Sequence, residues 1–254
     1  MEFQNLRLEI EAGLARIVLA RPAAANRVDA RLLREIEAAA ERVSDDASVA
    51  VCLVTAEGPD FCAGWDPETR EQLLIREPPI ADPFLPLAGL ACPVIAAVQG
   101  RALSAGLELA LACDVRLAAE DARFGLPEVG EGLLPLAGGT QRLARLAGRA
   151  VASAVLLLGE ELDAEAAYRC GLVSRVVPAS RLASEASAVA ARAASRGPLA
   201  LRYAKEAVRH GLALPLDEAL RYELDLSIIL QTTRDRAEGV RAFLEKREPR
   251  FEGE

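Results

Sequence analysis

Residues 92–120, CPVIAAVQGRALSAGLELALACDVRLAAE, show the fold class most clearly. The apolar run at residues 92–100 is short and contains β-branched residues, which predicts a buried strand. Residues 103–114 form a longer apolar run that predicts a helix, and DVRLAAE predicts a second strand. One acid, Glu108, interrupts the apolar helix, although a buried carboxylate without a partner is costly. Glu108 must therefore face solvent, have a partner, or serve a function.

The flanking segments continue this alternation of strands and helices. LRLEIEAGLARIVLARP, residues 6–22, alternates apolar and polar residues on both sides of a turn and predicts a hairpin. Residues 29–43 have helical spacing with Asp29 placed as the N-cap, and VAVCLVTA, residues 49–56, predicts a buried strand. The sequence predicts an α/β domain with mostly parallel strands, followed after about residue 147 by mostly helical segments.

Composition limits the possible classes of protein. The 254 residues are 52% hydrophobic with a net charge of −8, which favours a globular protein and argues against a nucleic-acid partner. The longest apolar runs are too short for a membrane span, and five cysteines without a CxxC pair are typical of a reduced, cytoplasmic protein. A single histidine argues against a multi-histidine metal site and a Ser-His-Asp triad, so no metal is expected.

Three stretches carry candidate chemistry. GPDFCAGWD, residues 58–66, and QGRALSAGLELA, residues 99–110, each place small residues directly after a predicted buried strand. Open α/β sheets bind ligands at these strand ends, and small residues let the backbone approach a ligand. FGLPEVGEGLLP, residues 124–135, adds Glu128 and Glu131 in a loop framed by glycine and proline.

Together with residues 93–130 and LPLAGGTQRLARLAG, residues 134–148, these stretches resemble the enoyl-CoA hydratase/isomerase (crotonase) superfamily along essentially the whole chain. The resemblance is closest to the enoyl-CoA hydratases. It implies an α/β fold, a crotonase-like spiral of ββα repeats over residues 1–196, with a C-terminal helical trimerisation region over residues 197–254. It also implies a homotrimer or dimer of trimers, and an acyl-CoA thioester as substrate, with no separate cofactor.

The same resemblance implies roles for individual residues. The thioester oxygen would lie between the backbone N–H groups of Ala63 and Ala105, which stabilise its developing negative charge. The hydratase glutamates match Glu108 and Glu128. Glu108 is expected to activate water for attack on C3, and Glu128 to donate a proton to C2, since two neighbouring acids titrate apart. Weaker candidates for CoA or acyl contact are Ala23, Ala25, Gly64, Trp65, Asp66 and Leu103.

Several residues depart from the family pattern. Glu131 stands where hydratases commonly have an apolar residue; it is either a solvated loop charge or part of a pocket for a polar or ring-bearing acyl chain. Leu136 replaces a frequent glycine whose N–H helps to hold the reacting water, and its side chain would narrow the pocket. Trp65 occupies a usually smaller position, where it contacts the substrate or packs in the core. Arg21 or Arg27 would hold CoA phosphate in place of a missing basic residue near Ala23.

The expected activity is hydration of a 2-enoyl-CoA, a lyase step of fatty-acid β-oxidation or aromatic-ring degradation. The departures at Glu131 and Leu136 leave an alternative open, namely an enoyl-CoA isomerase or a ring-opening acyl-CoA hydrolase that uses the same oxyanion hole. Fold by itself does not decide between these reactions.

Overall fold

A computed structural model describes residues 3–77 and 82–254. Its main sheet has six strands in the order β1-β2-β3-β4-β6-β9, and a second sheet has the order β5-β7-β8. The strands are β1 (Leu6–Glu11), β2 (Leu14–Leu19), β3 (Val51–Ala56), β4 (Val94–Val98), β5 (Arg101–Leu103), β6 (Val115–Ala119), β7 (Arg123–Gly125), β8 (Leu162–Asp163) and β9 (Arg175–Val177).

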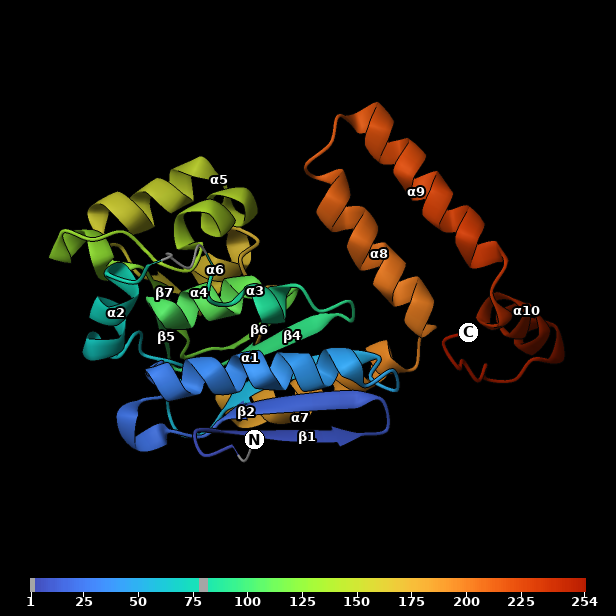
Figure 1. Cartoon of the computed structure of the whole chain (residues 1–254), viewed down its shortest axis with the longest axis horizontal. Coiled ribbons are helices and arrows are strands. Elements are labelled where there is room, and N and C mark those ends of the chain that lie inside the picture. The colour runs from blue at the N-terminus through green and yellow to red at the C-terminus, as the bar shows by residue number, and fades with distance from the viewer. Residues whose placement is uncertain (1–2, 78–81) are drawn as a thin grey trace.

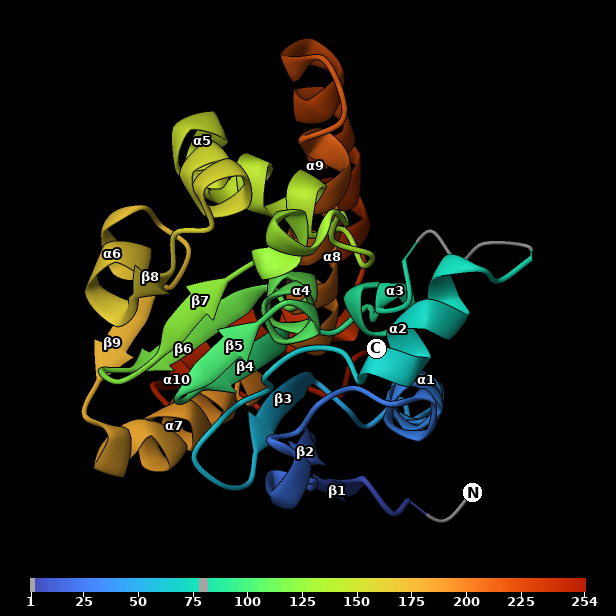
Figure 2. The ribbon, with the colours of Figure 1, turned by 90° about the vertical axis from the view of Figure 1, so that its left-hand side faces the viewer.

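Helices cover both faces of the main sheet, and the C-terminal helices extend away from it (Figures 1 and 2). They are α1 (Ala30–Asp45), α2 (Pro67–Leu74), α3 (Leu85–Ala88), α4 (Ala105–Ala112), α5 (Gly139–Leu158), α6 (Ala164–Arg169), α7 (Leu182–Ala194), α8 (Pro198–Gly211), α9 (Leu216–Gln231) and α10 (Arg234–Glu245). Short 3-10 helices lie at η1 (Pro22–Ala24), η2 (Pro127–Glu131) and η3 (Ala179–Arg181).

The predicted hairpin and first helix are confirmed. β1 and β2 pair antiparallel, and β2 then pairs parallel with β3. The Asp29 carboxylate accepts a hydrogen bond from the Leu32 N–H over 2.7 Å, as an N-cap should. The predicted parallel arrangement also holds, because β3, β4, β6 and β9 pair in parallel along the main sheet.

Alternate residues of the central strands serve two hydrophobic cores. Val51 and Leu53 of β3, like Ile95 of β4, pack on α7 in the smaller core. Cys52 and Val54 of β3 point to the other face, into the larger core with α1 and α4. The period of two therefore buries both faces of the sheet, which explains why these strands are continuously apolar.

Successive turns of the chain repeat one pattern, in which a main-sheet strand leads to a second-sheet strand and then to a helix. The units β4-β5-α4 and β6-β7-α5 both follow it. The pairing of β5 with β7 stacks these turns side by side, which is the predicted spiral. Each turn therefore delivers a loop and a helix start to the same region of the molecule.

Helices α8 and α9 pack against each other and project beyond the sheet (Figure 1). Large apolar side chains on the C-terminal helices remain exposed, among them Leu212, Leu216, Leu220, Leu224, Ile228 and Phe243. Within residues 3–77 and 82–254, no helix has the length and apolar character needed to cross a membrane. The same described residues contain no His, Cys, Asp and Glu cluster suited to a metal ion.

Candidate active site

The amino end of α4 lies directly against the segment that follows β3. Cys62 forms an isolated parallel bridge with Ala102 of β5. Gly106 approaches this segment so closely that a Cβ there would lie 2.0 Å from the Cys62 carbonyl oxygen. Because only glycine fits this contact, the first turn of α4 can reach the segment at residues 62–65.

Glu108 is fully buried in this helix and has partners for both carboxylate oxygens. Its Oε1 accepts hydrogen bonds from the N–H groups of Ala137 over 2.6 Å and Gly139 over 3.0 Å. Its Oε2 accepts a hydrogen bond from the indole Nε1 of Trp65 over 3.4 Å. The acid in the apolar helix is therefore paired with donors from two distant segments.

The pKa of Glu108 reflects opposing effects. Burial raises the pKa to about 7, while the N–H groups of Ala137 and Gly139 lower it. The nearby Glu128 raises the pKa of Glu108 further, and the Trp65 indole lowers it. A carboxyl that titrates near neutrality and is solvated only by N–H donors is suited to accept a proton.

Glu128 comes from the 3-10 helix η2 and is 2% exposed. Neither of its carboxylate oxygens has a hydrogen-bond partner among the described residues. Burial raises the pKa of Glu128; Glu131 raises it too, while the Ser104 hydroxyl and Arg70 lower it. The pKa of both buried carboxyls is therefore raised, but among the described residues Glu128 lacks the N–H donors that oppose this effect at Glu108.

The segment at residues 62–65 does not offer the backbone donor that the sequence suggested. The Ala63 N–H donates to the Ala25 carbonyl over 3.0 Å, so it is engaged in holding η1. Trp65 bridges in parallel to Val28, which directs the Trp65 N–H to the opposite edge, and this N–H has no partner among the described residues. Trp65 therefore replaces Ala63 as the donor candidate.

Ala105 retains its predicted position as first residue of α4. Among the described residues its N–H has no hydrogen-bond partner, as expected in the first turn of a helix. The preceding Ser104 has a φ of 51°, which is strained for a residue other than glycine. Its N–H donates to the Gly125 carbonyl over 2.9 Å and its carbonyl accepts from the Glu108 N–H, so the strained turn fixes where α4 begins.

Glu131 is neither fully solvated nor unpaired. Its Oε2 lies 2.7 Å from Nη1 of Arg70 on α2, with side-chain exposures of 51% for Glu131 and 21% for Arg70. The Nε of Arg70 is buried and has no hydrogen-bond partner among the residues that the structure describes. This ion pair joins η2 to α2 beside Glu128, a link that sequence reasoning missed because Arg70 lies 61 positions before its partner.

The weaker candidates for contact with CoA or the acyl chain differ in their burial and in their contacts. Asp66 caps α2 by accepting from the Thr69 N–H, and Leu103 ends β5. Ala23 is exposed, while Ala25 and Leu136 are partly buried. Gly64 has a φ of 121°, and a Cβ there would lie 3.1 Å from the Ser104 Cβ. Of these candidates, Gly64 directly precedes Trp65 and Leu136 directly precedes Ala137, and both Trp65 and Ala137 donate to Glu108.

The candidate phosphate cations differ in how they are held. Arg21 pairs with the Asp29 carboxylate at 3.0 Å and donates to the Arg27 carbonyl. Arg27 is exposed and has no ion pair within the part of the chain that the structure describes. Arg27 is therefore the freer of the two cations.

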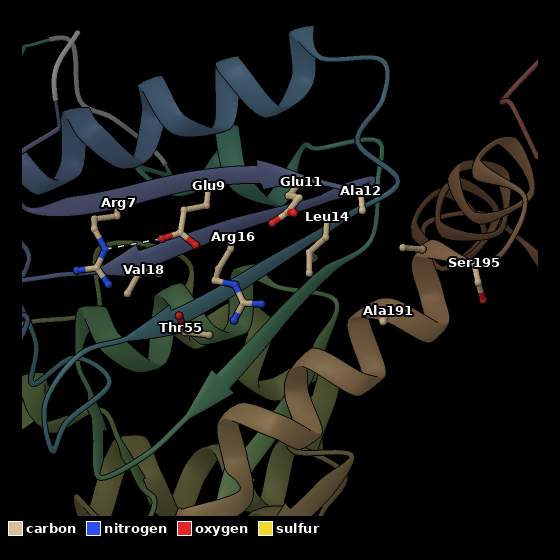
Figure 3. A pocket seen from close by; sticks show the side chains of 11 residues that line it. Arg7, Glu9, Glu11, Ala12, Leu14, Arg16, Val18, Thr55, Ala191 and Ser195 are labelled. Carbon is tan, nitrogen blue, oxygen red and sulfur yellow. Dashed lines mark ion pairs between the residues drawn. The ribbon is translucent and has the colours of Figure 1, made fainter.

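A separate groove lies on the outer side of the sheet and contains none of the predicted site residues (Figure 3). Side chains of β1 and β2, including Arg7, Glu9 and Arg16, line it together with the end of α7 and the following Ser195. Positive and negative charges alternate there, and Arg7 lies 4.0 Å from Glu9. The glutamates and free N–H groups thus gather elsewhere, around the start of α4.

Comparison with known proteins shows the family of the chain. The enoyl-CoA hydratase/isomerase family model matches residues 9–254. A "2,3-dehydroadipyl-CoA hydratase" of Escherichia coli is 41% identical over 93% of this chain and 94% of its own length. A "Probable enoyl-CoA hydratase echA8" of Mycobacterium bovis is 40% identical over 99% of both chains.

Solved structures show the same similarity. The crystal structure of an enoyl-CoA hydratase from Bacillus anthracis has a TM-score of 0.94 and 38% identity, covering 99% of this chain and 100% of that one. The fold is therefore of the crotonase type. The chain belongs to the enoyl-CoA hydratase/isomerase family.

Proposed function

We propose that the protein is a 2-enoyl-CoA hydratase that adds water across the 2,3 double bond of an acyl-CoA thioester. The observation that carries this proposal is the contrast between its two buried carboxyls. Glu108 accepts three N–H donors, whereas Glu128 has none among the described residues. One site thus holds a carboxyl prepared to accept a proton beside one prepared to donate a proton.

The reaction follows from these two states. Glu108 removes a proton from water as the water oxygen bonds to C3, and the π electrons move toward the thioester carbonyl. The N–H groups of Trp65 and Ala105 stabilise the resulting enolate oxygen, and each such donor contributes roughly 3–4 kcal/mol. Glu128 then delivers its proton to C2, which completes the 3-hydroxyacyl-CoA. A proton passing from Glu108 to Glu128, directly or through solvent, restores the starting state.

The CoA thioester is the substrate in this proposal, and no further cofactor takes part. Arg27 and Arg21 lie close together in the chain near η1, where a CoA phosphate would be bound. Leu136 follows the loop that contains Glu128, and its N–H has no hydrogen-bond partner among the described residues. We assign this N–H to the reacting water, since leucine retains the backbone donor of the more frequent glycine.

We further propose that residues 197–254 assemble the protein into a homotrimer or a dimer of trimers around the core at residues 1–196. The exposed leucines and isoleucines of α9 support this, together with Val208 of α8 and Phe243 of α10. Apolar patches of this extent typically become buried in an interface.

Hydration of crotonyl-CoA, followed as loss of the conjugated enoyl-thioester absorbance, tests the activity. We expect rapid loss with the wild-type protein. Glu108→Gln and Glu128→Gln should each lower kcat by roughly 10³-fold, because each removes a proton-transfer group.

Glu35→Gln is the matched control. Glu35 is also fully buried, but its oxygens accept backbone N–H bonds from Gln4, Asn5 and Leu6 in the N-terminal segment. This variant should retain hydration. A folded wild-type protein that binds crotonyl-CoA but does not hydrate it would contradict the proposal, and turnover of 3-enoyl or ring-bearing thioesters would then identify the isomerase or hydrolase alternative.

A further inference from the structure

Trp65 is the only tryptophan of the chain and is 4% exposed. It lies in the segment after β3 that packs against the start of α4. Its backbone N–H is the oxyanion donor proposed above. Its side chain points to the second half of the site, because the indole Nε1 donates to Oε2 of Glu108 over 3.4 Å. One residue therefore contacts both the proposed oxyanion position and the proposed base.

The indole ring is held in place by stacking. Phe84 lies parallel to it, with ring centroids 5.7 Å apart and an interplanar angle of 7°. The Phe84 N–H in turn donates to the Asp82 carboxylate over 3.1 Å, and that carboxylate pairs with Arg142 of α5. These contacts fix the plane of the ring, so the direction of its N–H is set before substrate arrives.

The donor acts on the oxygen of Glu108 that has no other partner among the described residues. Oε1 already takes the Ala137 and Gly139 N–H groups, and Oε2 takes only the indole. An indole N–H donates and never accepts, so it disfavours a proton on Oε2 at that position. The carboxylate is thereby held in one orientation, with both oxygens acting as acceptors.

Few other charged groups near Glu108 counteract the effect of the indole N–H on its protonation. From η2, the titratable group facing Glu108 is Glu128, and the start of α5 contributes only backbone N–H groups. Glu108 is itself the only charged residue of α4. Arg70 on α2 and Glu131 on η2 act on Glu128. After the backbone N–H groups of Ala137 and Gly139, the indole is the side-chain donor that lowers the pKa of Glu108.

We propose that Trp65 is a positioning residue for Glu108, whose indole N–H keeps the Glu108 carboxylate oriented and ionised for proton removal from water. This role rests on the proposed hydratase function. The hydrogen bond itself predicts an effect on Glu108 titration that does not depend on turnover.

Trp65→Phe tests the role, because phenylalanine can still stack on Phe84 but lacks the N–H. We expect kcat for crotonyl-CoA to fall roughly tenfold, the value for one lost hydrogen bond to a charged group, with little change in KM. The acidic limb of the kcat/KM profile should move to higher pH by roughly one unit, since protonated Glu108 becomes easier to form.

Phe84→Leu is the control, because it weakens the stacking and leaves the indole N–H present. Its acidic limb should move clearly less than that of Trp65→Phe, because the indole N–H remains present although the ring is held less firmly. If Trp65→Phe leaves the limb unmoved, or if Phe84→Leu moves it equally, Trp65 acts only through packing and the proposal is overturned.

A second readout separates this proposal from the hydratase assignment. Carboxyl ¹³C NMR of protein labelled at glutamate, with the Glu108 signal identified by its loss in Glu108→Gln, gives the titration of Glu108 directly. A shift to higher pH in Trp65→Phe supports the positioning role even if crotonyl-CoA is not hydrated. An unchanged titration overturns the role even if hydration is fast.

Discussion

At the scale of single residues, Glu108 carries a cost for stability. Burial raises the pKa of Glu108 in the folded protein from its ordinary value of 4.5 to about 7. Between these values the folded protein holds a proton that the unfolded chain releases, so the free energy of unfolding falls as pH rises. The loss is at most about 3.5 kcal/mol, because one pKa unit corresponds to about 1.4 kcal/mol.

Glu108→Gln should therefore flatten this dependence. Denaturant unfolding at pH 5.0 and 7.5 gives the drop in unfolding free energy, and the drop should be smaller in the variant by about 1–3 kcal/mol. Glu35→Gln provides the comparison at a buried carboxyl outside the site. An equal drop in wild type and Glu108→Gln would show that Glu108 does not titrate between these pH values.

The ion pair between Arg70 and Glu131 predicts a second effect at this scale. Glu131 raises the pKa of Glu128, so Glu131→Gln should lower it and move the basic limb of the kcat/KM profile to lower pH. Arg70→Met should have the opposite effect, because Arg70 lowers the pKa of Glu128. Profiles measured with crotonyl-CoA check both shifts. If the basic limb moves in the same direction in the two variants, the assignment is contradicted.

At the scale of elements, the contact between α4 and the segment after β3 is the most sensitive. In Gly106→Ala the added Cβ would lie 2.0 Å from the Cys62 carbonyl oxygen, so the helix must move away from residues 62–65. We expect a loss of about 2–3 kcal/mol in unfolding free energy and a large loss of hydration, since overpacking displaces backbone.

Gly211→Ala is the control for Gly106→Ala. Gly211 lies in α8, where a Cβ would meet Ala219 at an ordinary 3.5 Å. This change should be neutral or slightly stabilising, because alanine favours the helix. Urea unfolding compares the two variants, and equal stability would show that α4 does not need the close approach.

At the scale of the whole molecule, the exposed apolar side chains of α9 predict assembly. Leu220 and Leu224 are 53% and 59% exposed, one turn apart. Leu220→Glu combined with Leu224→Glu should convert the proposed trimer to monomers, because buried charges without partners destabilise an interface. Sedimentation velocity measures the mass; Glu223→Gln on the same helix should leave it unchanged. A wild-type protein that sediments as a monomer would contradict the proposed assembly.

Much of the fold followed from local pattern. The hairpin, α1 with its Asp29 cap, and strands β3, β4 and β6 were all predicted, because periodicity and capping depend on neighbouring residues. The strands of the second sheet were missed, since β5, β7 and β8 are two or three residues long and too short to show alternation. Gly148, with a φ of 82°, interrupts α5 close to residue 147, after which the sequence predicts mostly helical segments.

The sequence alone determined the α/β class, the family and the candidacy of Glu108 and Glu128, because these depend on residue type and order along the chain. Tertiary structure decided which backbone and side-chain groups lie beside the two glutamates. It engaged the Ala63 N–H with Ala25, left the Trp65 N–H without a partner, and brought Trp65 and the Ala137 loop to Glu108. Hydrogen-bond partners 29 to 43 residues apart meet only when the helices and sheets pack, so no local pattern reports them.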